Sequence, residues 1–367
     1  MARKYRVAVI GRTGKGDYGH GLDTVWLALD NVEIVAVADE DEKGRAAAAT
    51  RLKVRNAYAD YRQMLAKERA DVVSVAPRWP DCHRDLAVAC AEAGVHMFLE
   101  KPFSRTLAEA DEIVTACERK HIKLAIAHQT RYSPRLRRVR ELIAGGRIGD
   151  VIEMRGRGKE DRRGGGQDLM VLGTHIFDLM RFLVGDANWC SARVTQGGRP
   201  VTKADVHQGE ENIGPVAGDR IDATYGFRDG ILGAFGTHRA RHGAGTRFGL
   251  AVYGTKGVVQ MRTGGLPGVY LLEDPSWGLS GGKAAWQEVT SAGVGKPEPL
   301  KDGGLGLGNE WIARDLLESI EKDRQPLGSM YDGRAALEMI LAVYESHRLK
   351  GPVELPLKER RHPLTLL

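Results

Sequence analysis

The sequence predicts an α/β protein in two parts. An N-terminal doubly wound parallel sheet is followed by an α+β domain with a large, mostly antiparallel sheet. In the first third of the chain, short apolar runs alternate with stretches of helical spacing, and a glycine-rich segment follows the first run. After about residue 128 the alternation stops, and β-like stretches follow one another without helices between them. We therefore predict domains over residues 1–128 and 129–367.

The first domain is predicted from its apolar runs. Continuous runs are typical of strands that are buried on both faces and lie parallel, joined by crossover helices. Six strands in this arrangement form a nucleotide-binding sheet. We predict them at 5–11, 32–39, 64–66, 71–77, 95–100 and 122–128. The predicted helices are 22–30, 43–52, 83–94 and 107–120.

The second domain is predicted from consecutive β-like stretches, which favour an antiparallel sheet with one solvated or subunit-covered face. These stretches are 150–158, 221–227, 230–237, 248–255, 257–262 and the short 353–357. The predicted helices are 135–144, 168–184, 309–322 and 332–348. Because residues 275–308 are rich in glycine, we expect a long mobile loop there.

The composition is that of an ordinary folded protein and excludes several classes of partner. Hydrophobic residues make up 42% of the 367 residues and charged residues 28%, which excludes a disordered chain. The net charge is +6, but the one basic cluster, 131–140, lacks the interleaved aromatics that stack bases. We interpret this cluster as a solvated helix face and predict no nucleic-acid partner.

The spacing of the cysteines and the lengths of the apolar runs indicate the cellular compartment of the protein. The four cysteines form no C-x-x-C pair and no zinc-like spacing with histidine, so no metal site is predicted. They are expected to be buried thiols in a reducing compartment. No apolar run is long enough to cross a bilayer or to form a signal-peptide core. We therefore expect a cytoplasmic protein with no membrane partner.

The glycine-rich segment GRTGKGDYGHG (11–21) predicts a dinucleotide site. Glycines allow the tight turn and the close approach to a pyrophosphate, which is expected on the N-terminus of the following helix. Gly14, Gly16 and Gly19 match G-x-G-x-x-G, whereas Gly11 ends the strand. The two residues between Gly11 and Gly14 are a surplus that leaves the register of the motif relative to the strand open. The candidate cofactor-binding residues of the loop are Gly11, Arg12, Thr13, Gly14, Gly16, Tyr18 and Gly19.

Asp39 ends the second predicted strand, where a carboxylate can accept both ribose hydroxyls of an adenosine. The alternative is an aspartate that caps the next helix. Further acids follow at 40–42, so a 2′-phosphate would meet a negative field. This pattern favours NAD over NADP.

Lys101 follows the fifth predicted strand in the sequence Glu100-Lys101-Pro102. The carboxyl ends of such strands lie beside the nicotinamide. An ammonium there can stabilise alkoxide character as a hydride leaves, and Pro102 is a candidate for a cis peptide bond. The alternative is a surface lysine paired with Glu100.

These motifs together resemble the Gfo/Idh/MocA family of sugar and polyol oxidoreductases. The matching segments span nearly the whole chain: 73–104 with its Glu-Lys-Pro, 131–151 with Gly-Arg-Ile-Gly, 164–166 with 173–178, and 253–259. The resemblance implies a Rossmann domain followed by a domain whose large sheet serves substrate binding and subunit contacts. A homo-oligomer, dimer or tetramer, is therefore expected.

The resemblance also implies roles for individual residues. Lys101 corresponds to the family's active-site lysine, and His175 corresponds to its usual acid–base residue. The residues implied to lie along the cofactor are Ala76, Pro77, His83 and Glu100, together with Lys101.

One departure from the family pattern concerns the helix that carries His175. The family commonly has an aspartate four residues earlier, where this chain has Val171. Asp178, at i,i+3, is expected to hold the imidazole, with a surface pair to Arg181 as the alternative. Asp168, about 10 Å away along a continuous helix, is expected to reach distal substrate hydroxyls. The full set of candidate substrate-binding residues is Lys101, Lys159, Asp161, Asp168, His175 and Asp178.

The leading functional prediction is an NAD-dependent oxidoreductase. It would transfer a hydride between a secondary alcohol of a sugar, polyol or glycoside and the cofactor. One alternative is an enzyme that keeps NAD bound and uses transient oxidation to cleave or epimerise a sugar. Another is a non-catalytic, NAD-sensing regulator, which the presence of both Lys101 and His175 disfavours.

Overall fold

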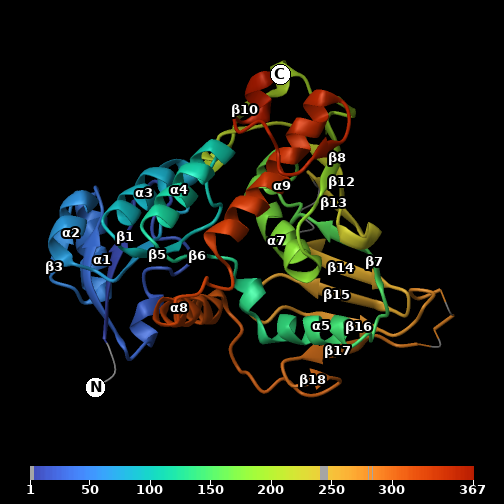
Figure 1. The fold of residues 1–367 in the computed structure, drawn as a ribbon, viewed down its shortest axis with the longest axis horizontal. Helices are drawn as coiled ribbons and strands as arrows, with labels where there is room; N and C mark the ends of the chain where they lie inside the picture. The colour runs from blue at the N-terminus through green and yellow to red at the C-terminus, as the bar shows by residue number, and fades with distance from the viewer. Residues whose placement is uncertain (1–3, 240–246, 280, 283) are drawn as a thin grey trace. The chain divides into compact units, whose positions relative to one another are not determined.

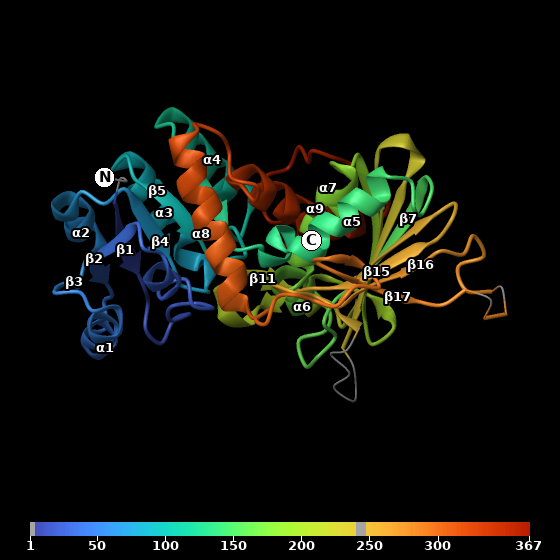
Figure 2. The ribbon, with the colours of Figure 1, turned by 90° about the horizontal axis from the view of Figure 1, so that it is seen from below.

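The computed structural model describes residues 4–239, 247–279, 281–282 and 284–367, which fold into two compact units (Figures 1 and 2). Unit 1 consists of Met1–Gln129, Glu210–Gly214 and Leu305–Arg334. Unit 2 consists of Thr130–Gly209, Pro215–Gly304 and Ala335–Leu367. The division of the sequence at residue 128 stays a prediction. Two later segments, Glu210–Gly214 and Leu305–Arg334, belong to the same compact unit as the N-terminal residues.

The sheet of unit 1 has six parallel strands among the described residues, in the order β3-β2-β1-β4-β5-β6. This is the predicted doubly wound arrangement, and the strand order reverses between β1 and β4. The strands are β1 (Tyr5–Ile10), β2 (Val32–Ala38), β3 (Asn56–Tyr58), β4 (Val72–Val75), β5 (His96–Leu99) and β6 (Leu124–Ile126).

The third strand differs from the prediction. Residues 64–66 lie in helix α2 (Tyr61–Glu68), and β3 precedes them. The side chain of Asp60 caps this helix by accepting the N–H of Arg62 at 2.8 Å. Met64 is fully buried on the inner side of the helix, so a short apolar run here marks a helix face rather than a strand.

The helices of unit 1 lie on both faces of the sheet. In Figure 1, α3 and α4 lie together above the strands, and α8 lies below them. Helix α8 contacts β6, β5 and the 3₁₀ helix η1. The chain that follows α8 pairs with β6, since the N–H of Ile126 donates to the carbonyl of Gly328 at 2.9 Å. The bounds are η1 (Val25–Ala28), α1 (Glu42–Leu52), α3 (His83–Glu92), α4 (Leu107–Arg119) and α8 (Leu305–Glu321).

The first crossover contains no α-helix, so the helix predicted at 22–30 is wrong. Only η1 forms, because the backbone stays irregular through Gly19 and Gly21, which have φ values of +63° and +85°. The helical spacing of apolar residues arises because the loop itself packs inward, and Leu22, Trp26 and Leu29 are all buried. The glycine-rich loop is therefore not followed by an α-helix N-terminus.

Unit 2 contains an eleven-stranded sheet within the described residues. Neighbouring strands are antiparallel except β7 and β13, which are parallel. The order is β18-β17-β16-β15-β14-β7-β13-β12-β8-β19, and β9 pairs with β8. The strands are β7 (Val151–Arg157), β8 (Trp189–Gln196), β9 (Arg199–Pro200), β12 (Arg220–Gly226), β13 (Leu232–His238), β14 (Gly249–Gly254), β15 (Val258–Arg262), β16 (Val269–Leu272), β17 (Gln287–Thr290), β18 (Gly293–Val294) and β19 (Val353–Glu354). A separate pair joins β10 (His207–Gln208) and β11 (Pro215–Val216).

One predicted helix of unit 2 is broken into two. The segment predicted as 168–184 consists of α6 (Gly166–Val171) and α7 (Gly173–Val184), and Leu172 between them has φ −117°. Helix α7 packs on β7 and β14, and Phe177 contacts the rings of Tyr225 and Phe235 in the core. The remaining helices are α5 (Pro134–Ala144) and α9 (Met330–Leu349).

The glycine-rich segment 275–308 is more ordered than predicted. It contains β17, β18 and the first turn of α8, while residues 280 and 283 lie outside the described residues. Arg135 of α5 holds this segment through ion pairs of 2.9 Å to Glu288 and 2.8 Å to Glu298. The expectation of a long mobile loop is therefore wrong for its second half.

Candidate active site and nucleotide pocket

The glycine-rich loop of unit 1 packs directly on the carboxyl ends of the sheet. Arg12 and Asp17 exchange two backbone hydrogen bonds of 3.0 Å, which closes a tight turn. A Cβ added to Gly16 would lie 2.6 Å from the backbone nitrogen of Trp79. A Cβ added to Gly19 would lie 2.6 Å from the carbonyl oxygen of Ala76 and 2.9 Å from Cγ of Glu100. Both positions therefore require glycine, as the dinucleotide motif predicts.

Asp39 faces this loop from the end of β2 and is almost fully buried. Its carboxylate accepts the Thr13 N–H at 3.1 Å and the Thr13 hydroxyl at 2.7 Å, and it also accepts the N–H of Asp41 at 3.0 Å. The helix-cap alternative is wrong, since Asp41 caps α1 by accepting the N–H of Gly44 at 2.6 Å. Tyr18 closes the same corner, and burial and the charge of Asp39 raise its pKa.

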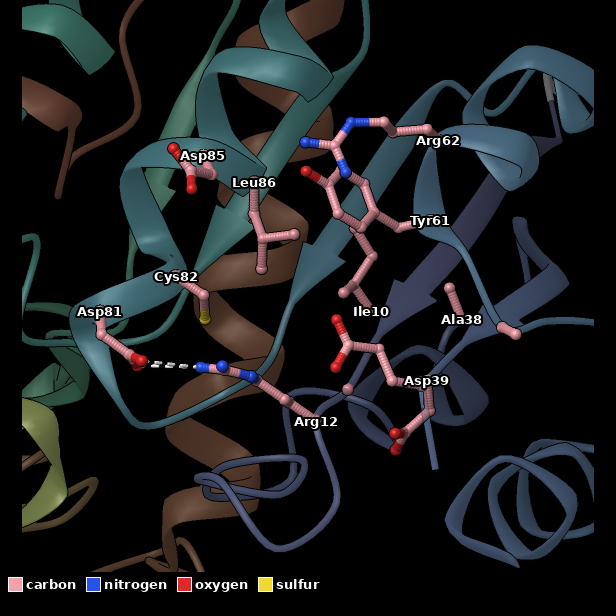
Figure 3. Close-up of a pocket in the computed structure, with 13 residues that line it drawn as sticks. Ile10, Arg12, Ala38, Asp39, Tyr61, Arg62, Asp81, Cys82, Asp85 and Leu86 are labelled. Carbon is pink, nitrogen blue, oxygen red and sulfur yellow. Dashed lines mark hydrogen bonds and ion pairs between the residues drawn. The ribbon is translucent and has the colours of Figure 1, made fainter. Parts of the chain in front are cut away.

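A pocket of about 220 Å³ opens beside this corner at the carboxyl ends of β1 and β2 (Figure 3). It lies next to the reversal of strand order, where doubly wound sheets bind nucleotides. Arg12 crosses the pocket and holds Asp81 through two hydrogen bonds of 3.0 and 2.9 Å. The lining residues are Ile10, Gly11, Arg12, Ala38, Asp39, Glu40, Ala59, Tyr61, Arg62, Asp81, Cys82, Asp85 and Leu86.

The residues present fit the adenosine half of a dinucleotide. The pocket offers the apolar side chains of Ile10 and Leu86 together with the carboxyl groups of Asp39 and Glu40. Its volume lies below the roughly 300–1,000 Å³ of pockets that enclose a whole ligand of drug size. The 3₁₀ helix η1 follows the loop in place of the expected α-helix, and the position of a pyrophosphate stays a prediction.

Glu100 and Lys101 lie at the end of β5, on the other side of the strand-order reversal. Glu100 has no exposed surface, and one carboxylate oxygen accepts the N–H of Lys101 at 2.5 Å. The other oxygen is bound by the ring nitrogen Nδ1 of His20. Burial opposes ionisation of Glu100, but the hydrogen bond from His20 and the charge of Lys101 outweigh it, and the pKa is lowered. Lys101 itself is only 7% exposed, so the surface-lysine alternative is wrong.

His20 is a site residue that the sequence prediction missed. The available signal was its position directly after Gly19, the last glycine of the motif. The partner is eighty residues away, so spacing along the chain could not reveal the contact.

His83 connects the ends of β4 and β5 through the backbone. Its Nε2 lies 2.7 Å from the carbonyl oxygen of Pro77, and its Nδ1 lies 2.8 Å from that of Pro102. The ring is completely buried, and burial lowers its pKa. Both ring nitrogens thus hold the strand ends, and the implied position of His83 along the cofactor stays a prediction. The peptide bond between Lys101 and Pro102 is cis.

In unit 2, Asp168 organises the chain that follows β7. Its carboxylate accepts the N–H of Lys159 at 3.2 Å, the N–H of Glu160 at 3.1 Å and the Thr237 hydroxyl at 2.5 Å. It has no exposed surface, and burial raises its pKa. We therefore revise the expectation that Asp168 reaches distal substrate hydroxyls, because its oxygens already hold this segment together.

Lys159 and Asp161 lie on the same segment, closer to solvent. Arg163 donates to Asp161 at 3.0 and 2.6 Å, and Lys159 lies 3.6 Å from the same carboxylate. The hydrogen bonds from Arg163 lower the pKa of Asp161. These side chains form a local charged cluster, and their role toward substrate stays a prediction.

His175 lies in the first turn of α7, with its ring edge-on to Phe248 at 6.3 Å between centroids. The break at Leu172 removes the continuous helix on which its distance to Asp168 was predicted. Val171 is buried at 2% exposure. The imidazole is therefore presented by a helix start rather than by a helix interior.

Asp178 forms a buried ion pair with Arg131. Arg131 Nη2 lies 2.6 Å from Asp178 Oδ1, and Nε lies 3.1 Å from both carboxylate oxygens. The predicted alternative was a surface pair with Arg181; Asp178 is 1% exposed and so does not lie on the surface, and Arg181 pairs with Asp186 at 2.7 Å. That Asp178 also holds His175 stays a prediction.

The part of the chain that the structure describes lacks two further features. Those residues include no group of three or more His, Cys, Asp or Glu side chains suited to a metal ion. None of their helices combines the length and apolar character that crossing a membrane requires.

Comparison with known families identifies the chain. Residues 5–128 match a model described as the oxidoreductase family, NAD-binding Rossmann fold, and residues 140–355 match its C-terminal alpha/beta domain. The chain belongs to the Gfo/Idh/MocA oxidoreductase family. Unit 1 of this family member thus contains an NAD-binding Rossmann domain, as predicted.

Individual relatives are more distant and are covered only in part. D-apiose dehydrogenase of Paraburkholderia graminis is 30% identical over an alignment of 217 residues that covers 56% of this chain and 56% of the relative. Levoglucosan dehydrogenase of Pseudarthrobacter phenanthrenivorans is 27% identical over 248 residues, covering 61% of this chain and 63% of the relative. The matched regions therefore span less than two thirds of these relatives.

Solved structures share the fold. A levoglucosan dehydrogenase in complex with NADH has a TM-score of 0.77 at 21% identity, covering 96% of this chain and all of its own. An oxidoreductase domain protein from Kribbella flavida has a TM-score of 0.75 at 24% identity, covering 97% of this chain and 100% of its own. Both confirm the predicted fold class.

Proposed function

We propose that this protein is an NAD-dependent oxidoreductase acting on a secondary alcohol of a sugar, polyol or glycoside. The observation that carries the proposal is Lys101, held beside the buried Glu100 at the carboxyl edge of β5 in an NAD-binding unit. The names of the relatives, D-apiose dehydrogenase and levoglucosan dehydrogenase, support the substrate class.

Bound NAD+ supplies the hydride acceptor. The ammonium of Lys101 stabilises the negative charge that develops on the substrate oxygen. Glu100 fixes the backbone at Lys101 and balances its charge, while His83 holds the adjoining Pro102 carbonyl. His175, in unit 2, is the proposed acid–base residue, because an imidazole titrates near neutrality.

Cofactor choice follows from the adenosine pocket. Asp39 and Glu40 give this end of unit 1 a negative field, which favours the ribose hydroxyls of NAD and disfavours the 2′-phosphate of NADP. Thr13 already donates to Asp39, so a ribose must share or replace that donor. Lys159 and Asp161 are the proposed polar contacts to substrate in unit 2.

The second candidate keeps NAD bound and uses transient oxidation to cleave or epimerise the sugar. The observation that favours it is Val171, a buried apolar side chain where the family commonly has an acid. Such a change alters how the proton on the substrate oxygen is handled.

A homo-oligomer, dimer or tetramer, is proposed through the sheet of unit 2. One face presents Leu232 and Tyr270, which are 44% and 45% exposed. In register with Tyr270 lie Gln260, Ala251, Arg155 and Ala234, and Leu232 is two residues before Ala234 on the same strand. Light scattering of the purified protein measures this directly.

One experiment separates the candidates. Purified protein is examined for bound NAD(H) and mixed with NAD+ and a panel of sugars, polyols and glycosides. Net formation of NADH supports the dehydrogenase. Conversion of a substrate without net NADH supports the bound-cofactor enzyme, and inertness across the panel contradicts both.

A further inference from the structure

The glycine-rich loop carries His20 away from the adenosine corner. Gly19 packs on Ala76 and Glu100, at the ends of β4 and β5, whereas Asp39 lies at the end of β2. In the order β3-β2-β1-β4-β5-β6 these positions fall on opposite sides of the reversal. His20 therefore stands on the side where Lys101 lies.

The contact with Glu100 defines which ring nitrogen of His20 carries hydrogen. One oxygen of Glu100 accepts the N–H of Lys101, and the other contacts Nδ1 of His20. An ionised carboxylate can only accept, so with Glu100 ionised the hydrogen of this bond is on Nδ1. In the neutral imidazole this leaves Nε2 with its lone pair free to accept a proton.

The backbone at His20 is fixed independently of the ring. Its carbonyl oxygen accepts a 2.9 Å hydrogen bond from Nδ2 of Asn309 in α8. The Asn309 amide oxygen in turn accepts from Nε2 of Gln129 at 2.8 Å. A helix and the chain after β6 thus hold His20 while Glu100 orients its ring, an arrangement that precise proton transfer requires.

The ring is also reachable from solvent. The side chain of His20 is 32% exposed, whereas that of Glu100 is completely buried. Within the described residues, Nδ1 has Glu100 as its partner and Nε2 makes no hydrogen bond. A histidine that served only to satisfy a buried acid would not need an accessible second nitrogen.

We propose that His20 is a further acid–base residue of this enzyme, with Nε2 as a second acceptor, beside His175, for the proton of the substrate hydroxyl. This inference rests on the proposed function. In the oxidation direction the alcohol O–H bond breaks and its single proton moves to one of the two imidazoles, at Nε2 when His20 takes it. The carbinol hydrogen leaves with its electron pair, so the alcohol becomes a carbonyl and NAD+, the oxidant, is reduced. The imidazolium formed is stabilised by Glu100.

Charged and neutral groups face His20 from the elements around it. The carboxylate of Glu100 contacts Nδ1 and stabilises an imidazolium formed at His20. Lys101 and His83 act on the same carboxylate, and α8 contributes the neutral Asn309.

The first test needs neither cofactor nor substrate. In protein labelled with ¹⁵N-histidine, the His20 signals are identified by their absence in His20→Asn. The neutral ring of His20 should show a protonated Nδ1 and an unprotonated Nε2. A neutral ring protonated at Nε2 overturns the proposal.

The second test separates an acid–base role from a structural one. Asparagine places an amide N–H near the position of Nδ1, so His20→Asn can keep the bond to Glu100 while it removes Nε2. Turnover should fall at least tenfold, with a changed pH–rate profile and with NAD+ affinity within threefold of the parent. Full turnover with an unchanged profile contradicts the proposal.

Controls keep this result distinct from the proposed function. His207→Gln, at an exposed histidine of unit 2, should match the parent. His175→Asn reports separately on the base proposed in unit 2. If the parent protein oxidises no alcohol, the proposed function fails, and the ring tautomer still decides whether Nε2 of His20 can act as a base.

Discussion

Arg131 and Asp178 form a buried ion pair in unit 2, with Nη2 2.6 Å from Oδ1 and side chains that are 5% and 2% exposed. The guanidinium also stacks 4.8 Å from the ring centre of Phe182. The pair links the segment before α5 to the helix that carries His175. It makes Asp178 a structural residue whatever its role toward the imidazole.

Asp178→Ala should destabilise the protein strongly, because it removes the carboxylate of a buried ion pair with Arg131. The expected loss in the free energy of unfolding is about 3–5 kcal/mol. Urea denaturation measures it. The matched control is Asp186→Ala, which breaks an ion pair whose acid is 77% exposed and should cost about 0–1 kcal/mol. Equal losses in the two variants would contradict the importance of the buried pair.

Asp178→Asn tests whether the same carboxylate acts on His175. If it does, removing the negative charge lowers the pKa of the imidazole, and turnover falls while the rising limb of the pH–rate profile moves to lower pH. The profile is measured with the substrate found in the panel. An unmoved limb with full turnover would restrict Asp178 to its pair with Arg131.

Asp39→Ala should weaken NAD+ binding, because the carboxylate that faces the ribose hydroxyls is lost. A hydrogen bond to a charged group contributes about 1.5–3 kcal/mol, so we expect a loss of roughly tenfold or more. Calorimetric titration of the parent and the variant with NAD+ and NADP+ measures this. The parent should prefer NAD+. Equal affinities of the parent for NAD+ and NADP+ would contradict the proposed preference for NAD.

Lys101→Met should lower turnover by about two decades or more, because removal of one preorganised charge at a developing oxyanion costs that much. Cofactor affinity should change little, which fluorescence titration checks. Lys358→Met, at an exposed lysine, is the control and should match the parent. Turnover within threefold of the parent in Lys101→Met would remove Lys101 from the mechanism.

Ionisation of Glu298 should make the free energy of unfolding of unit 2 depend on pH under acidic conditions. Burial opposes its ionisation, but hydrogen bonds from Ser291, Leu300 and Arg135 lower its pKa to about 2 from 4.5. A group whose pKa is lower in the folded state stabilises the fold above its unfolded pKa, and this contribution is lost as pH falls. Between about pH 4.5 and 2, the parent should therefore lose stability relative to Glu298→Gln. Parallel unfolding midpoints across that window would contradict this prediction.

Several features of the site were predictable from the sequence because they depend on local pattern. Continuous apolar runs predicted five of the parallel strands of unit 1, since burial on both faces removes polar positions from a strand. The glycines at 16 and 19 predicted the close approach of the loop to the sheet. Lys101 was predicted at the sheet edge, because the carboxyl ends of parallel strands meet there.

The same local rules failed where packing overrode them. The spacing of Leu22, Trp26 and Leu29 predicted a helix, but positive-φ glycines keep the preceding backbone irregular, and these side chains are buried by a loop. The pattern of 168–184 predicted one helix, although the chain breaks at Leu172. Periodicity reports which side chains are buried, and it does not report which backbone buries them.

Pairings between distant residues were decided by the tertiary structure alone. His20 meets Glu100 across eighty positions, Arg131 meets Asp178 across 47, and Thr13 meets Asp39 across 26. The sequence by itself determined the Rossmann sheet, the glycine-rich loop and the lysine at its edge, because each depends on a few neighbouring residues. Which acid orients which base depends on the path of the chain between them, and that path is fixed only when the whole core packs.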